Sequence, residues 1–198
     1  MSKLLLASAS SVRATLLRSA DIVFEVCAAN VDEDEIKASL LAQDCDAGVV
    51  ADALAEAKAA CVSAANPHAF VLGCDQILVC NGKLIGKSTS LGEARVLLSE
   101  LRGKDHILIT ACVLAKNGTP LWRRQDRCTM KMRPFSDGFL ETYLKLEGSS
   151  ILGSVGCYHL ESRGVQLFES VQGDYFSVLG LPLIPLLAAL RDHGIVEQ

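Results

Sequence analysis

The chain has 198 residues, of which 50% are hydrophobic and 21% charged, and it has a formal net charge of -4 and a sequence pI of about 5.6. This composition offers enough apolar surface for one core, so it excludes a disordered chain and predicts a single domain, residues 1–198, built as two lobes. The acidic balance supplies no basic surface for a nucleic acid polymer, and no apolar run has the length of a membrane span.

The first elements alternate between apolar runs and a helical pattern. Residues 4–7 predict a buried strand, and Ser10 is expected to cap a helix over residues 11–19. Residues 22–26 predict a second strand. The run 30–35 is polar and contains four successive carboxylates, so we expect a loop there.

The middle of the chain combines a strong helix with short strands. The alanine-rich residues 48–65 predict the helix, and the apolar residues 70–73 predict the strand after it. Two further short strands, residues 77–80 and 83–85, flank an Asn-Gly pair that is typical of a tight hairpin turn.

The second half begins with a capping-box motif at Ser90, which predicts a helix that runs to about residue 101 and stops at Gly103. A long antiparallel hairpin is predicted from residues 106–116 and 121–133, the second strand being polar on one side. The turn between these strands is again an Asn-Gly pair.

The last segments predict a short helix capped by Ser136, a glycine-rich stretch over 148–164, a strand over 165–171 and a closing helix over 181–193. This mixed order of helices and strands predicts an α/β fold with a mixed β-sheet.

The eight cysteines are scattered, and no two of them have C-x-x-C spacing. We predict that they are buried free thiols of a reducing compartment, and the four dispersed histidines predict no structural zinc. The short leucine run near the N-terminus lacks the length of a signal peptide. We therefore expect a cytoplasmic protein.

A first candidate site lies where the first strand turns into a helix, at Ser8, Ser10 and Arg13. Two hydroxyls, a guanidinium and the amides of a helix N-terminus all donate hydrogen bonds, a combination that suits phosphate oxygens. The alternative is that Ser10 only caps the helix and Arg13 is solvated.

A second candidate is Asp75, which follows the predicted strand 70–73. A carboxylate at the end of a strand, beside a glycine that lets a ligand approach, is a common magnesium ligand or general base. On this residue alone, an ordinary turn aspartate remains the alternative.

Lys87 lies in a glycine-bounded segment, residues 82–88, that resembles a P-loop but has Asn81 where the motif requires glycine. A P-loop is therefore excluded, although Lys87 can still neutralise a phosphate as a point charge. The carboxylates of residues 32–35 are either a solvated run or partners of Asp75 at a magnesium ion. Lys58 is either a snorkelling surface residue or a phosphate ligand.

Taken in order, these segments resemble the Maf family of nucleotide pyrophosphatases over nearly the whole chain. The matching motifs are Leu6-Ala7-Ser8-Ala9-Ser10 with Arg13, Val31-Asp32-Glu33, Ala55-Glu56-Ala57-Lys58-Ala59, Leu72-Gly73-Cys74-Asp75-Gln76, Gly86-Lys87 with Glu93-Ala94, Leu98 and Leu101, and Gly173-Asp174-Tyr175 with Ser177-Val178 and Gly180-Leu181-Pro182-Leu183. The resemblance implies a Maf/ITPase-like fold, in which helices flank a mixed sheet and two lobes surround a central nucleotide cleft.

The resemblance also implies an activity, the hydrolysis of a nucleoside triphosphate to its monophosphate and pyrophosphate, a reaction on an acid anhydride. Glu33 and Asp75 would hold a divalent cation, magnesium or manganese, and Asp75 would be the proton acceptor. Glu33 and Lys87 would also be catalytic. The residues that would bind the substrate are Ser8, Ser10, Arg13, Lys58, Gln76 and Glu161.

Specificity is implied by three positions. Gln76 after the catalytic aspartate, with Glu161 in the glycine-rich stretch, resembles the branch that hydrolyses 7-methyl-GTP. An ionised Glu161 only accepts hydrogen bonds, and guanine offers donors on N1 and N2. The alternative is the branch that prefers dTTP or UTP. Val12 departs from both branches, which usually place a large or basic residue before Arg13.

Two interpretations from other classes remain open. The family is also associated with restraint of septum formation, which implies a regulator that acts through a partner. A pseudoenzyme that binds nucleotide without cleaving it would suit Val12, but the retained Glu33, Asp75 and Lys87 argue against it. We expect a small-molecule nucleotide as the partner, no membrane association, no nucleic acid polymer, and a homodimer as the common state of the family.

Overall fold

The computed structural model describes residues 3–197, and within them seven strands form one sheet in the order β2-β1-β3-β5-β6-β7, with β4 paired to β3. The strands are β1 (Leu4–Leu6), β2 (Glu25–Val26), β3 (Phe70–Cys80), β4 (Lys83–Ile85), β5 (Asp105–Lys116), β6 (Thr119–Met132) and β7 (Phe168–Gln172). β1 pairs in parallel with β2 and β3, whereas β3–β4 and β6–β7 are antiparallel. The predicted α/β class with a mixed sheet is confirmed.

The helices of the described chain are α1 (Ser11–Ser19), α2 (Glu33–Leu41), α3 (Ala47–Ala65), α4 (Leu91–Leu101), α5 (Asp137–Glu147), α6 (Tyr175–Val178) and α7 (Leu183–Asp192), with 3-10 helices η1 (Gly148–Gly153) and η2 (Arg163–Leu167). None of them, over residues 3–197, is both long and apolar enough to cross a membrane.

The chain divides into two compact units. Of the described residues, unit 1 takes 3–76, 110–126 and 174–197, and unit 2 takes 77–109 and 127–173. The single domain with two lobes around a central cleft stays a prediction.

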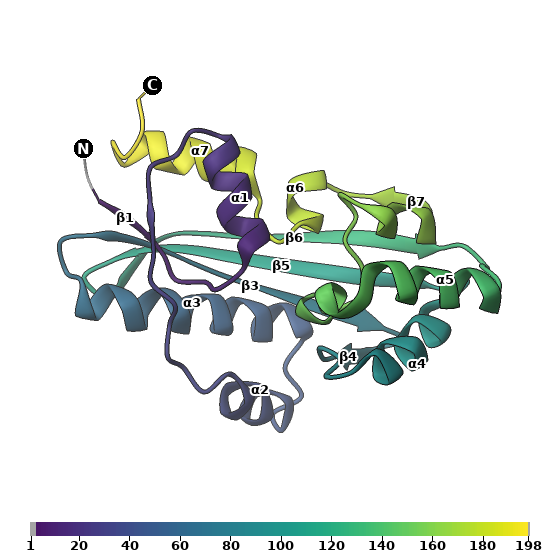
Figure 1. Cartoon of the computed structure of the whole chain (residues 1–198). Coiled ribbons are helices and arrows are strands. Elements are labelled where there is room, and N and C mark those ends of the chain that lie inside the picture. The colour runs from purple at the N-terminus through teal and green to yellow at the C-terminus, as the bar shows by residue number, and fades with distance from the viewer. Residues whose placement is uncertain (1–2, 198) are drawn as a thin grey trace. The chain divides into compact units, whose positions relative to one another are not determined.

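In unit 1, helices cover both faces of the sheet, with α1 and α7 on one face and α3 on the other (Figure 1). The alternation of side chains along β1 explains this arrangement. Leu6 packs in a buried cluster with Leu17 of α1 and Leu186 of α7, whereas Leu5 packs with Val62 of α3. Each face of this short strand therefore anchors a different layer of helices.

Several local predictions are confirmed. Ser10, Ser90 and Ser136 cap α1, α4 and α5, each accepting a hydrogen bond from the backbone N–H three residues further on. Both residues of each Asn-Gly pair, 81–82 and 117–118, have positive φ, as a type I′ hairpin turn requires.

The run 30–35 is not a loop throughout, because it contains the start of α2. The side chain of Asp32 caps this helix by accepting a hydrogen bond from the N–H of Glu35 at 2.9 Å. Carboxylates in a first helical turn are favoured by the helix dipole, so the acidic run stabilises α2.

The second strand is also shorter than predicted, since β2 begins only at Glu25. The N–H of Ile22 donates to the carbonyl of Leu17 at 3.0 Å, which ties that part of the predicted strand to the end of α1.

β3 is one continuous strand, not the two strands that the sequence predicts. Asp75 therefore lies inside a strand and not at its end. Successive residues of a strand face opposite sides, so Gly73 and Asp75 face α3 while Cys74 and Gln76 face the other side. Cys74 indeed belongs to the buried cluster of α1 and α7.

The C-terminal third differs from the prediction at two places. β7 begins at Phe168 and not at residue 165, because the segment before it is wound into η2. α6 was not predicted, and Asp174 caps it by accepting a hydrogen bond from the N–H of Ser177 at 2.8 Å. The closing helix α7 begins two residues later than predicted.

All eight cysteines are free, as predicted. Their predicted burial holds for Cys74, Cys80, Cys112, Cys128 and Cys157. It is wrong for Cys61, which is exposed on α3, and Cys27 and Cys45 are only partly buried.

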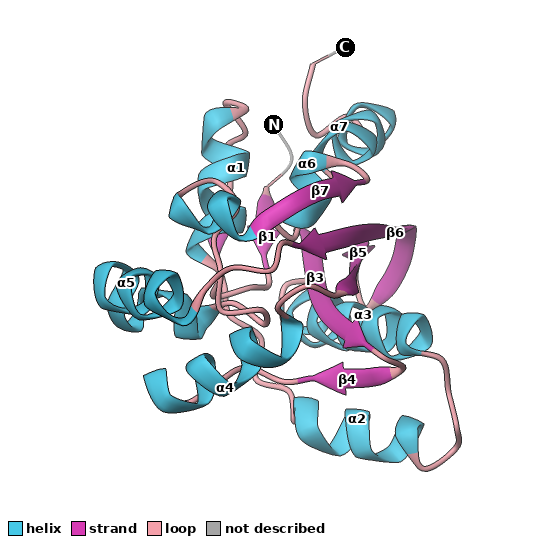
Figure 2. Ribbon diagram, turned by 90° about the vertical axis from the view of Figure 1, so that its right-hand side faces the viewer, coloured by secondary structure: helices cyan, strands magenta, loops and turns pink. Residues whose placement is uncertain are grey.

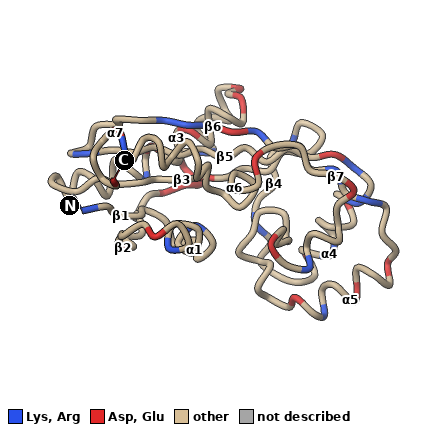
Figure 3. Tube along the Cα trace, turned by 90° about the horizontal axis from the view of Figure 1, so that it is seen from above, with Lys and Arg blue, Asp and Glu red and all other residues tan. Residues whose placement is uncertain are grey.

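The polar side of β6 fastens α3 to the sheet of unit 1. Basic and acidic positions follow one another along this strand (Figure 3). Arg123 forms an ion pair with Glu56, and the amide nitrogen of Gln125 donates to Asp52 at 2.8 Å. These contacts to α3 explain why one side of the strand is polar.

Close packing of α3 against β3 depends on Gly73. A Cβ atom at this position would lie 2.2 Å from the carbonyl oxygen of Ala55 and 2.6 Å from the nitrogen of Ala59. The backbones of helix and strand therefore touch, and no side chain fits between them.

Unit 2 contains α4 and α5, which contact each other (Figure 2). An ion pair between Arg95 and Glu141 joins the two helices. Its core holds the imidazole of His106, which is 1% exposed. Nε2 of this ring lies 2.7 Å from the hydroxyl of Tyr158, and Nδ1 has no hydrogen-bond partner among the described residues. Burial lowers the pKa of His106 from 6.5 to about 4.

We expect Gly73→Ala to lower the free energy of unfolding by about 1–3 kcal/mol, because α3 must move away from β3. The matched control is Gly138→Ala in α5, where no atom lies within 4 Å of the added Cβ. The control should be neutral or slightly stabilising. Urea unfolding of both variants measures the difference, and equal stabilities would contradict the close approach.

Acid should destabilise the fold through His106. Below pH 6.5 His106 takes up a proton in the unfolded chain but stays neutral in the folded chain down to about pH 4. The free energy of unfolding therefore falls between these two pH values, by about 3 kcal/mol from this group. His106→Gln should flatten the profile of unfolding free energy over that range. His68→Gln, at an exposed position, should keep the wild-type profile. A parallel shift of both variants would refute the assignment.

Candidate functional site

The ammonium group of Lys58 bridges two carboxylates in unit 1. Its Nζ lies 2.6 Å from Oδ1 of Asp75 and 2.9 Å from Oε1 of Glu33. The side chains of Lys58 and Asp75 are only 11% and 10% exposed. A charge so far removed from water needs an opposite charge beside it, so Lys58 is not a snorkelling surface residue.

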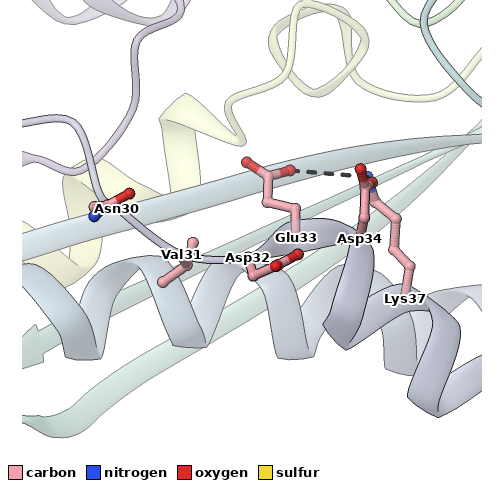
Figure 4. Close-up of a pocket in the computed structure, with 6 residues that line it drawn as sticks. All are labelled: Asn30, Val31, Asp32, Glu33, Asp34 and Lys37. Atoms are coloured by element: carbon pink, nitrogen blue, oxygen red, sulfur yellow. Dashed lines mark ion pairs between the residues drawn. The ribbon is translucent and has the colours of Figure 1, made fainter.

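The third member of this group, Glu33, is the first residue of α2, so the capping of α2 by Asp32 sets its position. Residues of the same segment line a hollow of about 560 Å³: Asn30, Val31, Asp32, Glu33, Asp34 and Lys37. The side chains of Glu33 and Lys37 approach each other there, with Nζ of Lys37 at 3.9 Å from Oε2 of Glu33 (Figure 4). The sequence left two alternatives for the acidic run, a solvated run or partners of Asp75 at a magnesium ion. The structure brings Glu33 to the ammonium that pairs with Asp75, and a magnesium ion there stays a prediction.

The two carboxylates fit a divalent cation of the magnesium type. Such an ion takes one or two carboxylates and completes its shell with water and phosphate oxygens. Over residues 3–197, no group of three or more His, Cys, Asp or Glu side chains could hold a metal ion. The donor set of Glu33 and Asp75 therefore suits a partly hydrated ion shared with an anionic ligand, and not an all-protein cage.

Arg13 connects three segments of unit 1. Its Nη1 donates to Oγ of Ser8 at 2.9 Å and to the carbonyl of Cys74 at 3.1 Å, and its Nε donates to the carbonyl of Gly180 at 2.8 Å. The alternative of a solvated Arg13 is therefore wrong. Ser10 does cap α1, as that alternative states, and its N–H donates to Oγ of Ser8 at 3.3 Å.

The predicted phosphate site and the carboxylate site belong to opposite faces of β3. Arg13 and Ser8 lie with α1, whereas Lys58 reaches Asp75 from α3. Cys74 links the two groups, because its carbonyl accepts from Arg13 and the next residue is Asp75. Phosphate binding by Ser8, Ser10 and Arg13 stays a prediction.

The amide of Gln76 is held by α6. Its Nε2 lies 2.8 Å from Oγ1 of Thr110, 3.1 Å from the carbonyl of Ser177 and 3.0 Å from the carbonyl of Val178. Since an amide nitrogen has two hydrogens, these acceptors use its donors fully. Gln76 can therefore offer a ligand only its carbonyl oxygen, which accepts hydrogen bonds.

Sequence reasoning gave no role to the residues that support Gln76, although Asp174 and Ser177 belong to one of the matching motifs. The hydroxyl oxygen of the buried Ser177 lies 2.7 Å from Oδ2 of Asp126 and 3.0 Å from Oδ1 of Asp174, and its single hydrogen can be donated to either carboxylate. Thr110 donates to the carbonyl of Ser177 at 2.8 Å. The spacing of Asp174 and Ser177 was a signal for a capped helix. Nothing in the sequence marks Asp126 or Thr110.

Three further residues of the described chain, which the sequence predicts to be functional, make none of these contacts. Val12 is partly buried on α1. Lys87 and Glu161 belong to unit 2, and both are exposed. The stretch that contains Glu161 is tied to α5 by His159 and Arg163, whose nitrogens lie 4.0 Å and 3.5 Å from the carboxylate of Glu147. The roles of Val12, Lys87 and Glu161 stay predictions.

Comparison with known proteins identifies the family of this chain. Residues 3–193 match the Maf-like protein family. The chain belongs to the Maf family. The resemblance inferred from the ordered motifs is thereby confirmed over nearly the whole chain.

The relatives match over nearly their whole length. A nucleoside triphosphate pyrophosphatase of Caulobacter vibrioides is 51% identical over 96% of this chain and 94% of its own. A nucleoside triphosphate pyrophosphatase of Maricaulis maris is 46% identical over 100% of both chains. A 7-methyl-GTP pyrophosphatase of Brucella suis is 45% identical over 98% of both.

The ion pair of Lys58 and Asp75 can be tested in this Maf chain by a double-mutant cycle. Lys58→Met leaves the carboxylate of Asp75 buried without its counter-charge and should cost about 3 kcal/mol of unfolding free energy. In an Asp75→Asn background the same change should cost about 1–3 kcal/mol less. Urea unfolding of the four proteins measures this coupling.

The control for this cycle is Lys37→Met, whose ammonium lies at 3.9 Å from Glu33 near the surface. It should change stability by about 0.5 kcal/mol or less. Strict additivity of Lys58→Met and Asp75→Asn would show that the two side chains are not paired.

Proposed function

We propose that this chain is a nucleoside triphosphate pyrophosphatase that hydrolyses the bond between the α- and β-phosphates, and that 7-methyl-GTP is its substrate. The proposal rests on the buried pair of Lys58 and Asp75 and the partly exposed Glu33 beside it, in which a carboxylate able to accept a proton lies beside a fixed positive charge. The names of relatives that are 45–51% identical over 94% or more of both chains support the same reaction.

The chain's own residues supply most of the chemistry. Asp75 accepts the proton of the water that attacks the α-phosphorus, a role for which its carboxylate is oriented by Lys58. Arg13, Ser8, Ser10 and the amides at the start of α1 bind phosphate oxygens. Lys87 neutralises charge on the departing pyrophosphate.

A divalent cation, magnesium or manganese, belongs to the proposal, and Glu33 and Asp75 are the residues that would hold it. Such an ion supplies charge neutralisation at the phosphates and lowers the pKa of a bound water. The fixed ammonium of Lys58 keeps the two carboxylates together before the ion and the nucleotide bind.

The preference for 7-methyl-GTP rests on hydrogen-bond acceptors. Gln76 offers a ligand only its carbonyl oxygen, because α6 occupies its nitrogen. An ionised Glu161 also only accepts. Guanine has donors on N1 and N2, and methylation at N7 adds positive charge to the ring, whereas the O2 and O4 of uracil and thymine are acceptors.

The proposal is tested by pyrophosphate release from 7-methyl-GTP, GTP, CTP, UTP, dTTP and 5-methyl-UTP with magnesium. We expect 7-methyl-GTP to give the highest kcat/KM and Asp75→Asn to lower kcat by about 10²–10⁴-fold, because the proton acceptor is lost. The matched control is Asp34→Asn, an exposed carboxylate of the same acidic run as Glu33, which should keep wild-type kinetics.

Each part of the proposal has its own contradicting outcome. Fast cleavage of UTP or dTTP would overturn the assigned substrate, whereas the assigned reaction would still hold. Full activity of Asp75→Asn would overturn the assigned proton acceptor. No cleavage of any nucleotide would favour a protein that binds nucleotides or regulates septum formation.

A further inference from the structure

Two buried cysteines face each other beside the site. Cys74 of β3 and Cys112 of β5 lie on neighbouring strands, and both are 0% exposed. The thiol of Cys112 donates to the sulfur of Cys74 with 3.0 Å between the two Sγ atoms. A disulfide bond measures about 2.05 Å, so the sulfurs need to move by only about 1 Å to form one.

The geometry points to a modification site: we propose that a hydroperoxide converts Cys74 and Cys112 into a disulfide, reversibly, and that this disulfide lowers turnover at the adjacent Asp75. No residue of this pair takes part in the proposed hydrolysis. The effect on turnover rests on the proposed function, whereas formation of the disulfide does not.

The chemistry balances with hydrogen peroxide as the oxidant. One thiol loses its proton and attacks a peroxide oxygen as the thiolate, and the O–O bond breaks. The leaving hydroxide takes up a proton, so that one thiol and one peroxide give a sulfenic acid and water. The second thiol then attacks that sulfur, an S–S bond forms, the S–O bond breaks, and a second water leaves. The two sulfurs together lose two electrons, which the peroxide gains. Hydrogen peroxide is nearly as small as water, so a brief local opening of the sheet admits it.

Cys74 is connected to the site in two ways, so a displacement of this residue also displaces site residues. Its carbonyl accepts the hydrogen bond from Arg13, and its peptide bond continues into Asp75, which is paired with Lys58. Misplacement of a reacting group by about 1 Å can cost about 10²-fold in rate. Closing the sulfurs by that distance therefore disturbs both the predicted phosphate ligands and the proton acceptor.

The remaining cysteines supply a matched control. Cys61 is the exposed thiol of α3 and reacts first with any oxidant on grounds of access, and its thiol donates to the carbonyl of Asn30 at 3.8 Å. If peroxide lowered turnover through general oxidation, the loss would depend on Cys61. If it lowers turnover through the disulfide, the loss depends on Cys112.

The experiment treats the reduced protein with hydrogen peroxide, blocks residual thiols, and analyses a tryptic digest by mass spectrometry. Cleavage at lysine gives peptides 59–83 and 105–116, which contain Cys74 and Cys112. We expect these two peptides to be linked, with fragment ions that assign the link to Cys74 and not to Cys61 or Cys80. Pyrophosphate release should fall by about tenfold or more and return on treatment with dithiothreitol.

The variants separate the explanations. Cys112→Ser should form no link and keep its activity under peroxide, whereas Cys61→Ser should behave as the wild type. Absence of the linked peptides in the wild type overturns the inference whether or not the protein cleaves nucleotides. A complete link with unchanged activity, or equal inactivation of Cys112→Ser, overturns the control of turnover. A reduced protein that cleaves no nucleotide overturns the proposed function itself, and the control of turnover with it.

Discussion

The contact between the backbones of α3 and β3 at Gly73 is the constraint on which the site depends. With no side chain between them, the helix lies close enough to deliver the ammonium of Lys58 to Asp75, two residues along the strand. Buried charges are tolerated only when they are paired, so this proximity makes the ion pair possible and the pair in turn holds Glu33 at the start of α2. The packing of α3, the pairing of the buried charges and the position of the acidic segment therefore depend on one another.

Predictions from the sequence succeeded where the cause was local. Ser10 and Ser136 cap helices because a serine hydroxyl reaches a backbone N–H three residues away, and the Asn-Gly pairs turn hairpins because both residues accept positive φ. The ordered motifs named the family and most of the candidate residues. Local reasoning failed for the acidic run, where the cap at Asp32 outweighed the polar composition, and for β3, where pairing with its neighbours carried the strand past Gly73.

What could not be predicted depends on contacts between distant parts of the chain. Arg13 donates to Gly180, 167 positions away, and Gln76 donates to Ser177, 101 positions away. Neither pattern nor propensity contains such partners. Yet these contacts determine which hydrogen-bonding groups of each side chain remain for a ligand. Arg13 already uses some of its donors within the protein, and Gln76 has only its carbonyl oxygen left as an acceptor. Which ligand groups Arg13 and Gln76 can bind therefore depends on the folded arrangement and does not follow from residue type alone.

Contact between main chains has a consequence for how far the sequence can drift. A distance set by packed side chains changes whenever one of them is exchanged, whereas the approach of α3 to β3 is set by peptide groups, which every substitution leaves in place. Gly73 is needed to preserve the spacing, and the small side chain of Ala59 faces it, with its Cβ 2.8 Å from where a Cβ at position 73 would lie. Much of the remaining core is then free to vary without moving Lys58 from Asp75.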